Sequence, residues 1–117
     1  MDTARLIHWA IPALVAAFLG GRFLMFLLAR RQIPSLLAAG AVVVDVRSPA
    51  EFAAGARPGS VNIPLGDLER RLEALDPAKP VILCCASGTR SAMAASILKR
   101  HGFNRVVNAG PWTNTML

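Results

Sequence analysis

Two adjacent cysteines, Cys84 and Cys85, are followed by a short loop of small and polar residues that includes Arg90. A buried strand that leads through such a loop into a helix gathers backbone N–H groups at the positive end of the helix dipole. This arrangement stabilises an anion, so it would lower the pKa of a cysteine at its base and make that thiol a nucleophile at neutral pH. Gly88 allows the positive φ that a tightly curved loop requires, and Arg90 adds a positive charge beside its mouth. The sequence therefore predicts a nucleophilic cysteine in an anion-binding loop.

The two cysteines are predicted to have different roles, because only one of them adjoins the loop. Cys84 follows the apolar residues of the strand and is interpreted as a small buried hydrophobic side chain. Cys85 is followed directly by the glycine-containing loop and the helix start, and it is the candidate nucleophile. A disulfide between adjacent cysteines is strained, and it is also disfavoured in the cytoplasm, where we expect this part of the chain to lie.

The apolar pattern around the loop predicts a three-layer α/β domain with a central parallel sheet. Residues 41–46 and 81–84 are short apolar runs, as expected of central strands that are covered on both faces. Between them, Ser48 begins a helix with a capping box that Glu51 completes, and leucines at helical spacing predict an amphipathic helix over residues 65–75. Further strands are predicted at residues 61–64 and 105–108, and further helices at residues 35–39 and 92–101, the last followed by Gly102. This alternation of strands and helices implies a parallel sheet between two layers of helices.

The N-terminal part of the chain has a different composition. Of the 24 residues from 6 to 29, 19 are hydrophobic, and Arg30 and Arg31 follow directly. A helix of this length is about 36 Å long, enough to cross a hydrocarbon core of about 30 Å. Arg22 is close enough to the Arg30 end for its side chain to snorkel to the headgroups. We therefore predict a single membrane-spanning anchor helix at residues 6–29, with a packed or interfacial helix as the alternative. The positive charge after the segment predicts that the following domain faces the cytoplasm.

Length and composition limit the other possibilities. The chain has 117 residues, of which 54% are hydrophobic, and a net charge of +6. These values argue against disorder, repeats and disulfide-rich scaffolds, and they allow one small domain behind the anchor. The basic residues are scattered and no aromatic side chains alternate with them, so nucleic-acid binding is not predicted. His8 and His101 are isolated, so no metal site is predicted.

Three motifs in succession resemble those of the rhodanese (sulfurtransferase) family. Residues 85–91, Cys-Ala-Ser-Gly-Thr-Arg-Ser, resemble the active-site loop of that family, and residues 45–52 resemble its DVR-x-x-x-E-F signature. Residues 55–64 resemble the segment usually written G-H-I-P-G-A-x-N-I-P. The order and spacing of the three motifs are more specific than any one of them. The resemblance covers residues 33–112, which we identify as a rhodanese-like domain.

The resemblance implies that the chain is a sulfurtransferase. Cys85 would accept a sulfane sulfur from a small donor and become a persulfide, and a thiol, or cyanide in an assay, would then remove that sulfur. The residues that would hold the outer sulfur are Ala86, Ser87, Gly88, Thr89, Arg90 and Ser91. Asp45, Arg47 and Glu51 are expected to support the site as an ion-paired group that ties the first strand to the loop region. No cofactor is implied, and the partners are the donor, the thiol acceptor and, through the anchor, the membrane.

The sequence departs from the family pattern in three places. Ala86 stands where many thiosulfate-using members carry arginine or lysine, so an anionic donor has one positive partner fewer. Ala56 replaces the usual histidine of the third motif. The helix predicted over residues 35–39 is shorter than is usual in the family. We therefore expect the edge strand before it to be reduced or missing, and the anchor or the membrane surface to complete the packing of this short helix.

Two other functions remain open on the sequence alone. Counted from Cys84, the loop has the C-x5-R-S spacing of cysteine-dependent phosphatases and arsenate-type enzymes, which ends at Arg90 and Ser91. Counted from Cys85, it has the C-x4-R spacing of sulfurtransferases, and the serine and glycine of the loop match the rhodanese pattern only in this count. The longer loop admits a tetrahedral oxyanion, whereas the shorter one fits a single outer sulfur. The third hypothesis is a non-catalytic, membrane-anchored docking module, which the presence of a nucleophile in an intact loop disfavours.

Overall fold

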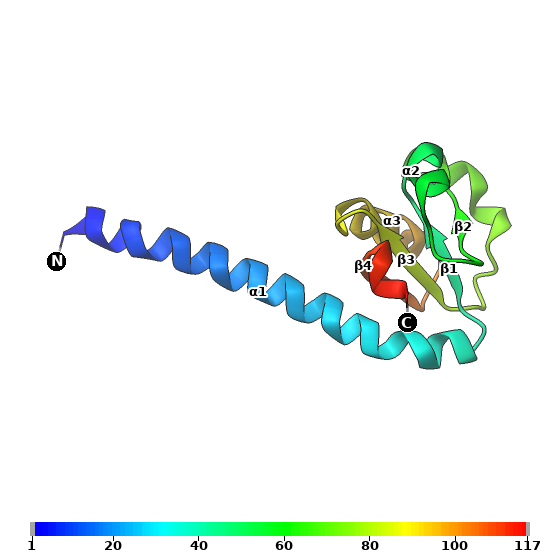
Figure 1. The fold of residues 1–117 in the computed structure, drawn as a ribbon, viewed down its shortest axis with the longest axis horizontal. Coiled ribbons are helices and arrows are strands. Elements are labelled where there is room, and N and C mark those ends of the chain that lie inside the picture. The colour runs from blue at the N-terminus through cyan, green and yellow to red at the C-terminus, as the bar shows by residue number, and fades with distance from the viewer. Residues whose placement is uncertain (1, 117) are drawn as a thin grey trace.

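A four-stranded parallel sheet lies at the centre of the computed structural model, which describes residues 2–116 (Figure 1). The strands are β1 (Val42–Asp45), β2 (Val61–Asn62), β3 (Val81–Cys85) and β4 (Val106–Pro111), and their spatial order is β2-β1-β3-β4. All three neighbouring pairs are parallel. Every residue of β3 is buried, because this inner strand is covered on both faces. The predicted central parallel sheet is confirmed, and within residues 2–116 no strand precedes β1.

Successive residues of the inner strands point to opposite faces of the sheet, and this alternation divides the core into two clusters. One face packs against α3 (Thr89–Arg100) and η1 (Leu65–Ala74), with Val44, Leu83, Leu68 and Leu98 among its buried side chains. The other face packs against the C-terminal part of α1 (Thr3–Ala38), and its buried cluster consists of Ile33, Val43, Ile82, Cys84 and Ala109. The domain thus has three layers with the sheet in the middle.

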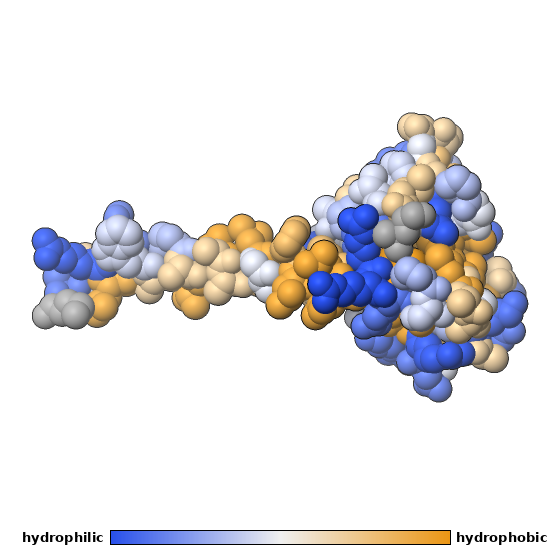
Figure 2. All heavy atoms as spheres, turned by 60° about the horizontal axis from the view of Figure 1, so that its bottom comes forward, coloured by the Kyte–Doolittle hydropathy of each residue, from blue (hydrophilic) through white to orange (hydrophobic). Residues whose placement is uncertain are grey.

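The helix α1 is continuous from a projecting arm into the domain. Its 36 residues correspond to a length of about 54 Å. The large apolar side chains of its first half are exposed, and Figure 2 shows this arm reaching away from the rest of the molecule. Ala29 and Ile33 are instead buried against the domain, with exposed fractions of 6% and 0%. By length and composition alone, α1 could cross a membrane.

The helix predicted separately over residues 35–39 is the last turn of α1, so the expectation of two helices was wrong. Pro34 lies inside α1, although a proline removes one backbone hydrogen bond from a helix. The helix nevertheless continues to Ala38; Ser35 donates its hydroxyl hydrogen to the carbonyl of Gln32 at 2.9 Å, and Ile33 is held on the sheet. The sheet face is therefore covered by the same helix that was predicted to anchor the chain.

The capping signals in the sequence correspond to the starts and ends of helices in the structure. Ser48 is the N-cap of α2 (Pro49–Ala54), and a complete capping box joins it to Glu51. Gly102 has a φ of 90° just after α3, as expected of a glycine that ends a helix. These short-range patterns were predictable because each depends on residues within one turn of the chain.

Two predicted boundaries and one predicted helix type were wrong. α3 begins at Thr89 instead of residue 92, because the left-handed Gly88 turns the chain into the helix directly. The segment η1 is a 3-10 helix with a break at Arg71 instead of a continuous α-helix. β4 extends to Pro111 instead of ending at residue 108, and a register shift opposite Leu83 and Cys84 accommodates the extra residue.

Candidate active site

Cys85 is the last residue of β3, and its sulfur lies at the base of the loop that leads into α3. The backbone N–H of Gly88 donates to Cys85 Sγ at 2.9 Å, and Ser91 Oγ lies 3.4 Å from the same sulfur. Gly88 has a φ of 101°, a left-handed conformation that residues with a Cβ rarely adopt. α3 begins at the next residue, so the positive end of its dipole lies close to the loop. The loop therefore places hydrogen-bond donors and positive electrostatic potential around one sulfur atom.

The two neighbouring thiols differ in pKa. Burial raises the pKa of the Cys85 thiol, but hydrogen bonds from the Ser91 side chain and from the backbone N–H groups of the loop outweigh it, and the net pKa is lower than usual. Burial and the nearby Asp45 carboxylate raise the pKa of the Cys84 thiol to about 12. Cys84 is also fully buried, in the cluster on the α1 face of the sheet. Of the two, Cys85 is the thiol that ionises more readily.

Asn108 of β4 holds the loop and its serine in place. Its amide group donates to the carbonyl of Gly88 at 3.1 Å, and its Oδ1 accepts from Ser91 Oγ at 2.6 Å and from the Gly110 N–H at 2.9 Å. The hydroxyl of Ser91 has one hydrogen, which can point to Asn108 or rotate to Cys85 Sγ. A thiolate can accept this hydrogen, because Gly110 continues to satisfy Asn108 Oδ1. Asn108 was not predicted as a site residue; its only signal was a polar side chain in an expected strand.

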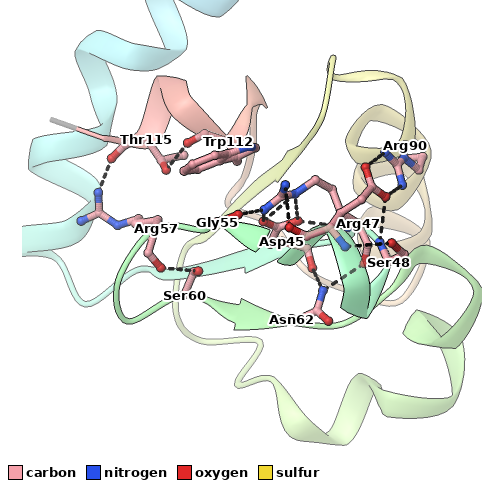
Figure 3. A network of polar contacts seen from close by, with 11 residues as sticks. Asp45, Arg47, Ser48, Gly55, Arg57, Ser60, Asn62, Arg90, Trp112 and Thr115 are labelled. Atoms are coloured by element: carbon pink, nitrogen blue, oxygen red, sulfur yellow. Dashed lines mark hydrogen bonds and ion pairs between the residues drawn. The ribbon is translucent and has the colours of Figure 1, made fainter. Parts of the chain in front are cut away.

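Asp45 and Arg47 form a buried ion pair beside the sheet (Figure 3). Arg47 Nη2 lies 2.8 Å from Asp45 Oδ2, and the guanidinium also donates to the carbonyls of Glu51 (3.3 Å) and Gly55 (2.7 Å). The hydrogen bond with Asp45 raises the pKa of Arg47, so the guanidinium stays charged. The ring of Trp112 lies over the guanidinium with its centroid 4.9 Å away. These contacts brace β1, α2 and the C-terminal segment against one another.

Arg90 forms a separate ion pair with Glu51, at 2.7 and 3.0 Å between the four terminal atoms. The hydrogen bonds from Arg90 and from Ser48 lower the pKa of Glu51 to about 2. The expectation of a single ion-paired group is therefore corrected to two pairs, Asp45 with Arg47 and Glu51 with Arg90. The positive charge that Arg90 was predicted to place beside the loop is paired with Glu51.

Arg22 and Phe26 of α1 contact the loop. Arg22 Nη2 donates to the carbonyl of Ser87 at 3.1 Å and to Thr89 Oγ1 at 3.2 Å. Phe26 covers Gly88 so closely that a Cβ at that glycine would lie 2.5 Å from Phe26 Cζ. The side chain of Arg22, which was predicted to extend toward the headgroups, is hydrogen-bonded to the loop. Its sequence signal was a charge within an apolar helix, which needs a polar partner.

The predicted loop residues occupy different positions around the sulfur. Ala86, Ser87 and Thr89 are exposed, Arg90 is half-buried, and Gly88 and Ser91 are buried. None of the polar contacts of Asp45 and Arg47 involves the loop. Within residues 2–116, no group of three His, Cys, Asp or Glu side chains is placed to hold a metal ion. The chemistry of the site therefore resides in a thiol and in the donors around it.

Comparisons with known proteins match the chain to one protein family. The family described as the Rhodanese-like domain matches residues 30–110. A sulfurtransferase of Allochromatium vinosum is 34% identical over 67 residues, which cover 57% of this chain and 63% of that protein. The thiosulfate sulfurtransferase GlpE of Stutzerimonas stutzeri is 37% identical over 75 residues, which cover 64% of this chain and 69% of that protein. The chain spans from 40% to 63% of the length of four of its curated relatives.

The fold has counterparts among solved structures. A structure described as a rhodanese with anions from E. coli superposes with a TM-score of 0.60 at 32% identity, over 63% of this chain and 89% of that one. The human single-domain sulfurtransferase TSTD1 superposes with a TM-score of 0.56 at 33% identity, over 68% of this chain and 86% of that one. Sequence matches and fold matches thus agree with each other.

Proposed function

Because the chain belongs to the rhodanese-like domain family, we propose that it is a sulfurtransferase in which Cys85 carries the transferred sulfur as a persulfide. The observation that carries this proposal is the position of Cys85 Sγ, 2.9 Å from the Gly88 nitrogen and 3.4 Å from Ser91 Oγ at the start of α3. Relatives named as sulfurtransferases support the reaction class.

The sulfur moves in two displacement steps. The Cys85 thiolate attacks the sulfane sulfur of the donor, so that a new S–S bond forms as the donor's own bond to that sulfur breaks. The donor remnant, sulfite in the case of thiosulfate, leaves with the bonding electron pair. An acceptor thiolate or cyanide then attacks the outer sulfur, and Cys85 leaves as a thiolate. Atoms and charge balance in each step, and neither step requires a cofactor.

The loop assists both steps by stabilising negative charge. Hydrogen bonds that favour the Cys85 thiolate make it available as the nucleophile in the first step and improve it as the leaving group in the second. In the persulfide the charge lies on the outer sulfur, where N–H groups of residues 86–91 and the dipole of α3 would stabilise it. The small donor is a thiosulfate-like compound or a persulfide, and the enzyme belongs to the thiosulfate:cyanide class in this proposal.

The proposal includes a location at the membrane. The part of the predicted anchor (residues 6–29) that precedes Arg22 enters the bilayer, since Arg22 and Ala29 pack against the domain, and the domain at residues 33–112 faces the cytoplasm. The exposed apolar side chains along α1 and the arginines at positions 30 and 31 support this arrangement. Because Arg22 and Ala29 contact the domain, the domain would lie directly against the membrane surface. Protease digestion of sealed right-side-out vesicles tests the orientation: protection of the domain is expected, and its removal would contradict a cytoplasmic location.

The role of Cys85 is tested by mass spectrometry of the full chain after incubation with thiosulfate and with a small persulfide. A gain of one sulfur mass on Cys85 is expected in the wild type and in Cys84→Ser, and no gain in Cys85→Ser. Persulfide formation that persists in Cys85→Ser would refute the assignment of the nucleophile. A wild-type chain that gains no sulfur from any donor would instead support a non-catalytic docking module.

The same pair of variants tests the phosphatase alternative. Its nucleophile would be Cys84, which lies on the opposite face of the sheet from the loop's sulfur and has a pKa of about 12. We therefore expect no hydrolysis of p-nitrophenyl phosphate. Turnover that is lost in Cys84→Ser and kept in Cys85→Ser would overturn the sulfurtransferase proposal.

A further inference from the structure

We propose that the cleft between α1 and the Cys85 loop binds the sulfur donor, and that this donor is an organic anion with an apolar substituent. The inference rests on the proposed function and deepens it. It assigns Arg22, a residue of the predicted anchor helix, to the anionic group of the donor, and the apolar side chains of α1 to its substituent.

The distribution of charge around the loop identifies Arg22 as the residue that can bind the anionic group of the donor. The position after the nucleophile is Ala86, which is neutral, and the guanidinium of Arg90 is paired with Glu51. Arg22 uses only Nη2 in its contacts with Ser87 and Thr89, and within residues 2–116 it forms no ion pair. Its charge is therefore uncompensated, and its remaining N–H groups are available to an anion at the edge of the loop.

The cleft has two chemically different walls. It has a volume of about 460 Å³, and it is lined on the α1 side by Phe18, Gly21 and Met25 and on the loop side by Gly88, Thr89 and Asn108, with Arg22 between them. Phe18 and Met25 are more than half exposed, at 65% and 53%. A donor with a charged end and an apolar end would match this division, because each end would contact a wall of its own kind.

Gly21 keeps the α1 wall open. A Cβ at Gly21 would meet no other atom within 4 Å, and the same holds for the neighbouring Gly20. Gly21 lines the cleft and Gly20 does not. A large side chain at position 21 would therefore project toward the space assigned to the donor, whereas the same side chain at position 20 would leave it free. The two glycines form a matched pair for an experiment.

Alkyl thiosulfonates are suitable probes, because they combine an anionic sulfane sulfur with an apolar chain. The Cys85 thiolate attacks the terminal sulfur of the thiosulfonate and forms a new S–S bond. The bond between that sulfur and the sulfonyl sulfur breaks, and the alkyl sulfinate leaves with the electron pair. One anion and one thiolate give one sulfinate and one persulfide anion, so atoms and charge balance.

The experiment measures the second-order rate constant of persulfide formation on Cys85 by mass spectrometry, with the full chain in phosphatidylcholine nanodiscs. For thiosulfonates from methyl to hexyl, the rate constant of the wild type should rise by up to about fourfold per methylene, the factor that corresponds to the free energy of burying that group. Arg22→Gln should lower it about tenfold for every donor, the usual loss when a charged hydrogen bond is removed. Gly21→Leu should abolish the dependence on chain length.

Two matched variants serve as controls. Arg31→Gln removes the same charge from an exposed position of α1 outside the cleft, and Gly20→Leu adds the same side chain beside it. Both should behave as the wild type. Equal losses in Arg22→Gln and Arg31→Gln would refute the role of Arg22. A chain-length dependence that survives in both glycine variants would show that long donors merely concentrate in the bilayer, and would refute the cleft.

Failure of this inference is distinguishable from failure of the proposed function. If Cys85 gains sulfur from methyl thiosulfonate and from thiosulfate, but at rates that do not depend on chain length or on Arg22, the sulfurtransferase proposal stands and the donor cleft is wrong. If Cys85 gains sulfur from none of these donors, the proposed function itself is wrong.

Discussion

Cys84 and Cys85 are consecutive residues of β3, yet they lie on opposite faces of the sheet and in different chemical surroundings. On the face covered by α1, Cys84 packs with Ile33, Ile82 and Ala109, and its thiol has a pKa of about 12. On the face covered by α3, hydrogen bonds from the loop and from Ser91 lower the pKa of the Cys85 thiol. A step of one residue along a strand is therefore enough to change a buried packing group into a candidate nucleophile.

The comparison shows where each face obtains its properties. Buried apolar side chains hold α1 against its face of the sheet, and this face supports the fold. The α3 face has the helix N-terminus and the left-handed Gly88, which direct N–H groups at one atom. The separation is not complete, because Arg22 and Phe26 of α1 extend past the edge of the sheet and contact the loop.

Alkylation should show the largest difference between the two faces. In the folded chain near neutral pH, iodoacetamide should modify Cys85 at least about a thousandfold faster than Cys84, because the thiolate is the reactive form and the pKa of Cys84 is raised to about 12 while that of Cys85 is lowered. Peptide mass spectrometry at successive times measures both rates. The rate at Cys85 should fall as the pH is lowered through its depressed pKa, because the thiolate is the reactive form.

Ser91→Ala is the control for this difference. It removes the side-chain hydrogen bond that lowers the pKa of Cys85, so the pH profile of alkylation should move to higher pH without a gain in Cys84 reactivity. Similar alkylation rates at the two cysteines in the native protein would contradict the assignment of different roles to the two faces.

Asp45→Asn should have the next largest effect, on stability. Asp45 is fully buried, and the variant would leave the buried Arg47 guanidinium without its counter-charge. Breaking a buried pair by removing one partner typically costs about 3–5 kcal/mol, so the free energy of unfolding in urea should fall by this order. Asp67→Asn, which removes one partner of an exposed ion pair with Arg70, should cost less than about 1 kcal/mol. Equal losses in the two variants would mean that the buried pair has no special structural role.

The sheet and the local turns could be predicted from sequence because their signals are short-range. The apolar runs of β1 and β3, the capping box at Ser48 and the glycine at position 88 each depend on a few consecutive residues. The loop from Cys85 to Ser91 was predictable for the same reason, since its donors come from neighbouring backbone groups.

Contacts made across the fold could not be predicted in this way. Arg22 is 65 residues from its partner Ser87, and Arg90 is 39 residues from Glu51. The sequence showed each of these charges but not which partner it would find. Asn108 was missed because an asparagine in a strand has no distinctive pattern until β4 is placed beside the loop. The 3-10 form of η1 was missed because leucines at helical spacing fit both kinds of helix.

Ile33→Ala tests how much the α1 face depends on the end of the anchor helix. Ile33 is fully buried between α1 and the sheet, so truncation should lower the free energy of unfolding by about 2–4 kcal/mol. Leu19→Ala, on the exposed arm of the same helix, should change it by less than about 0.5 kcal/mol in detergent. Urea titration followed by circular dichroism measures both. Equal stability of the Ile33 variant and the wild type would mean that α1 does not complete the packing of the sheet.

The smallest effect is expected at the ion pair between Glu51 and Arg90, which joins α2 to the start of α3. The pKa of Glu51 is lowered from 4.5 to about 2, first by Arg90 and then by Ser48. A carboxyl whose pKa is depressed in the folded state stabilises that state above its unfolded pKa, and this contribution is lost as the pH falls through the folded pKa. The melting temperature of the wild type should therefore exceed that of Glu51→Gln near pH 6, and the difference should shrink between pH 4.5 and about 2. Because both side chains are more than a third exposed, the difference should also decrease with added salt.

Glu69→Gln, which removes a carboxylate that has no ion pair within residues 2–116, should show no such pH dependence. If the melting temperatures of the wild type and Glu51→Gln differ by the same amount over this pH range, the ion pair does not hold α2 against the start of α3. The α3 face would then depend on the backbone of its loop alone.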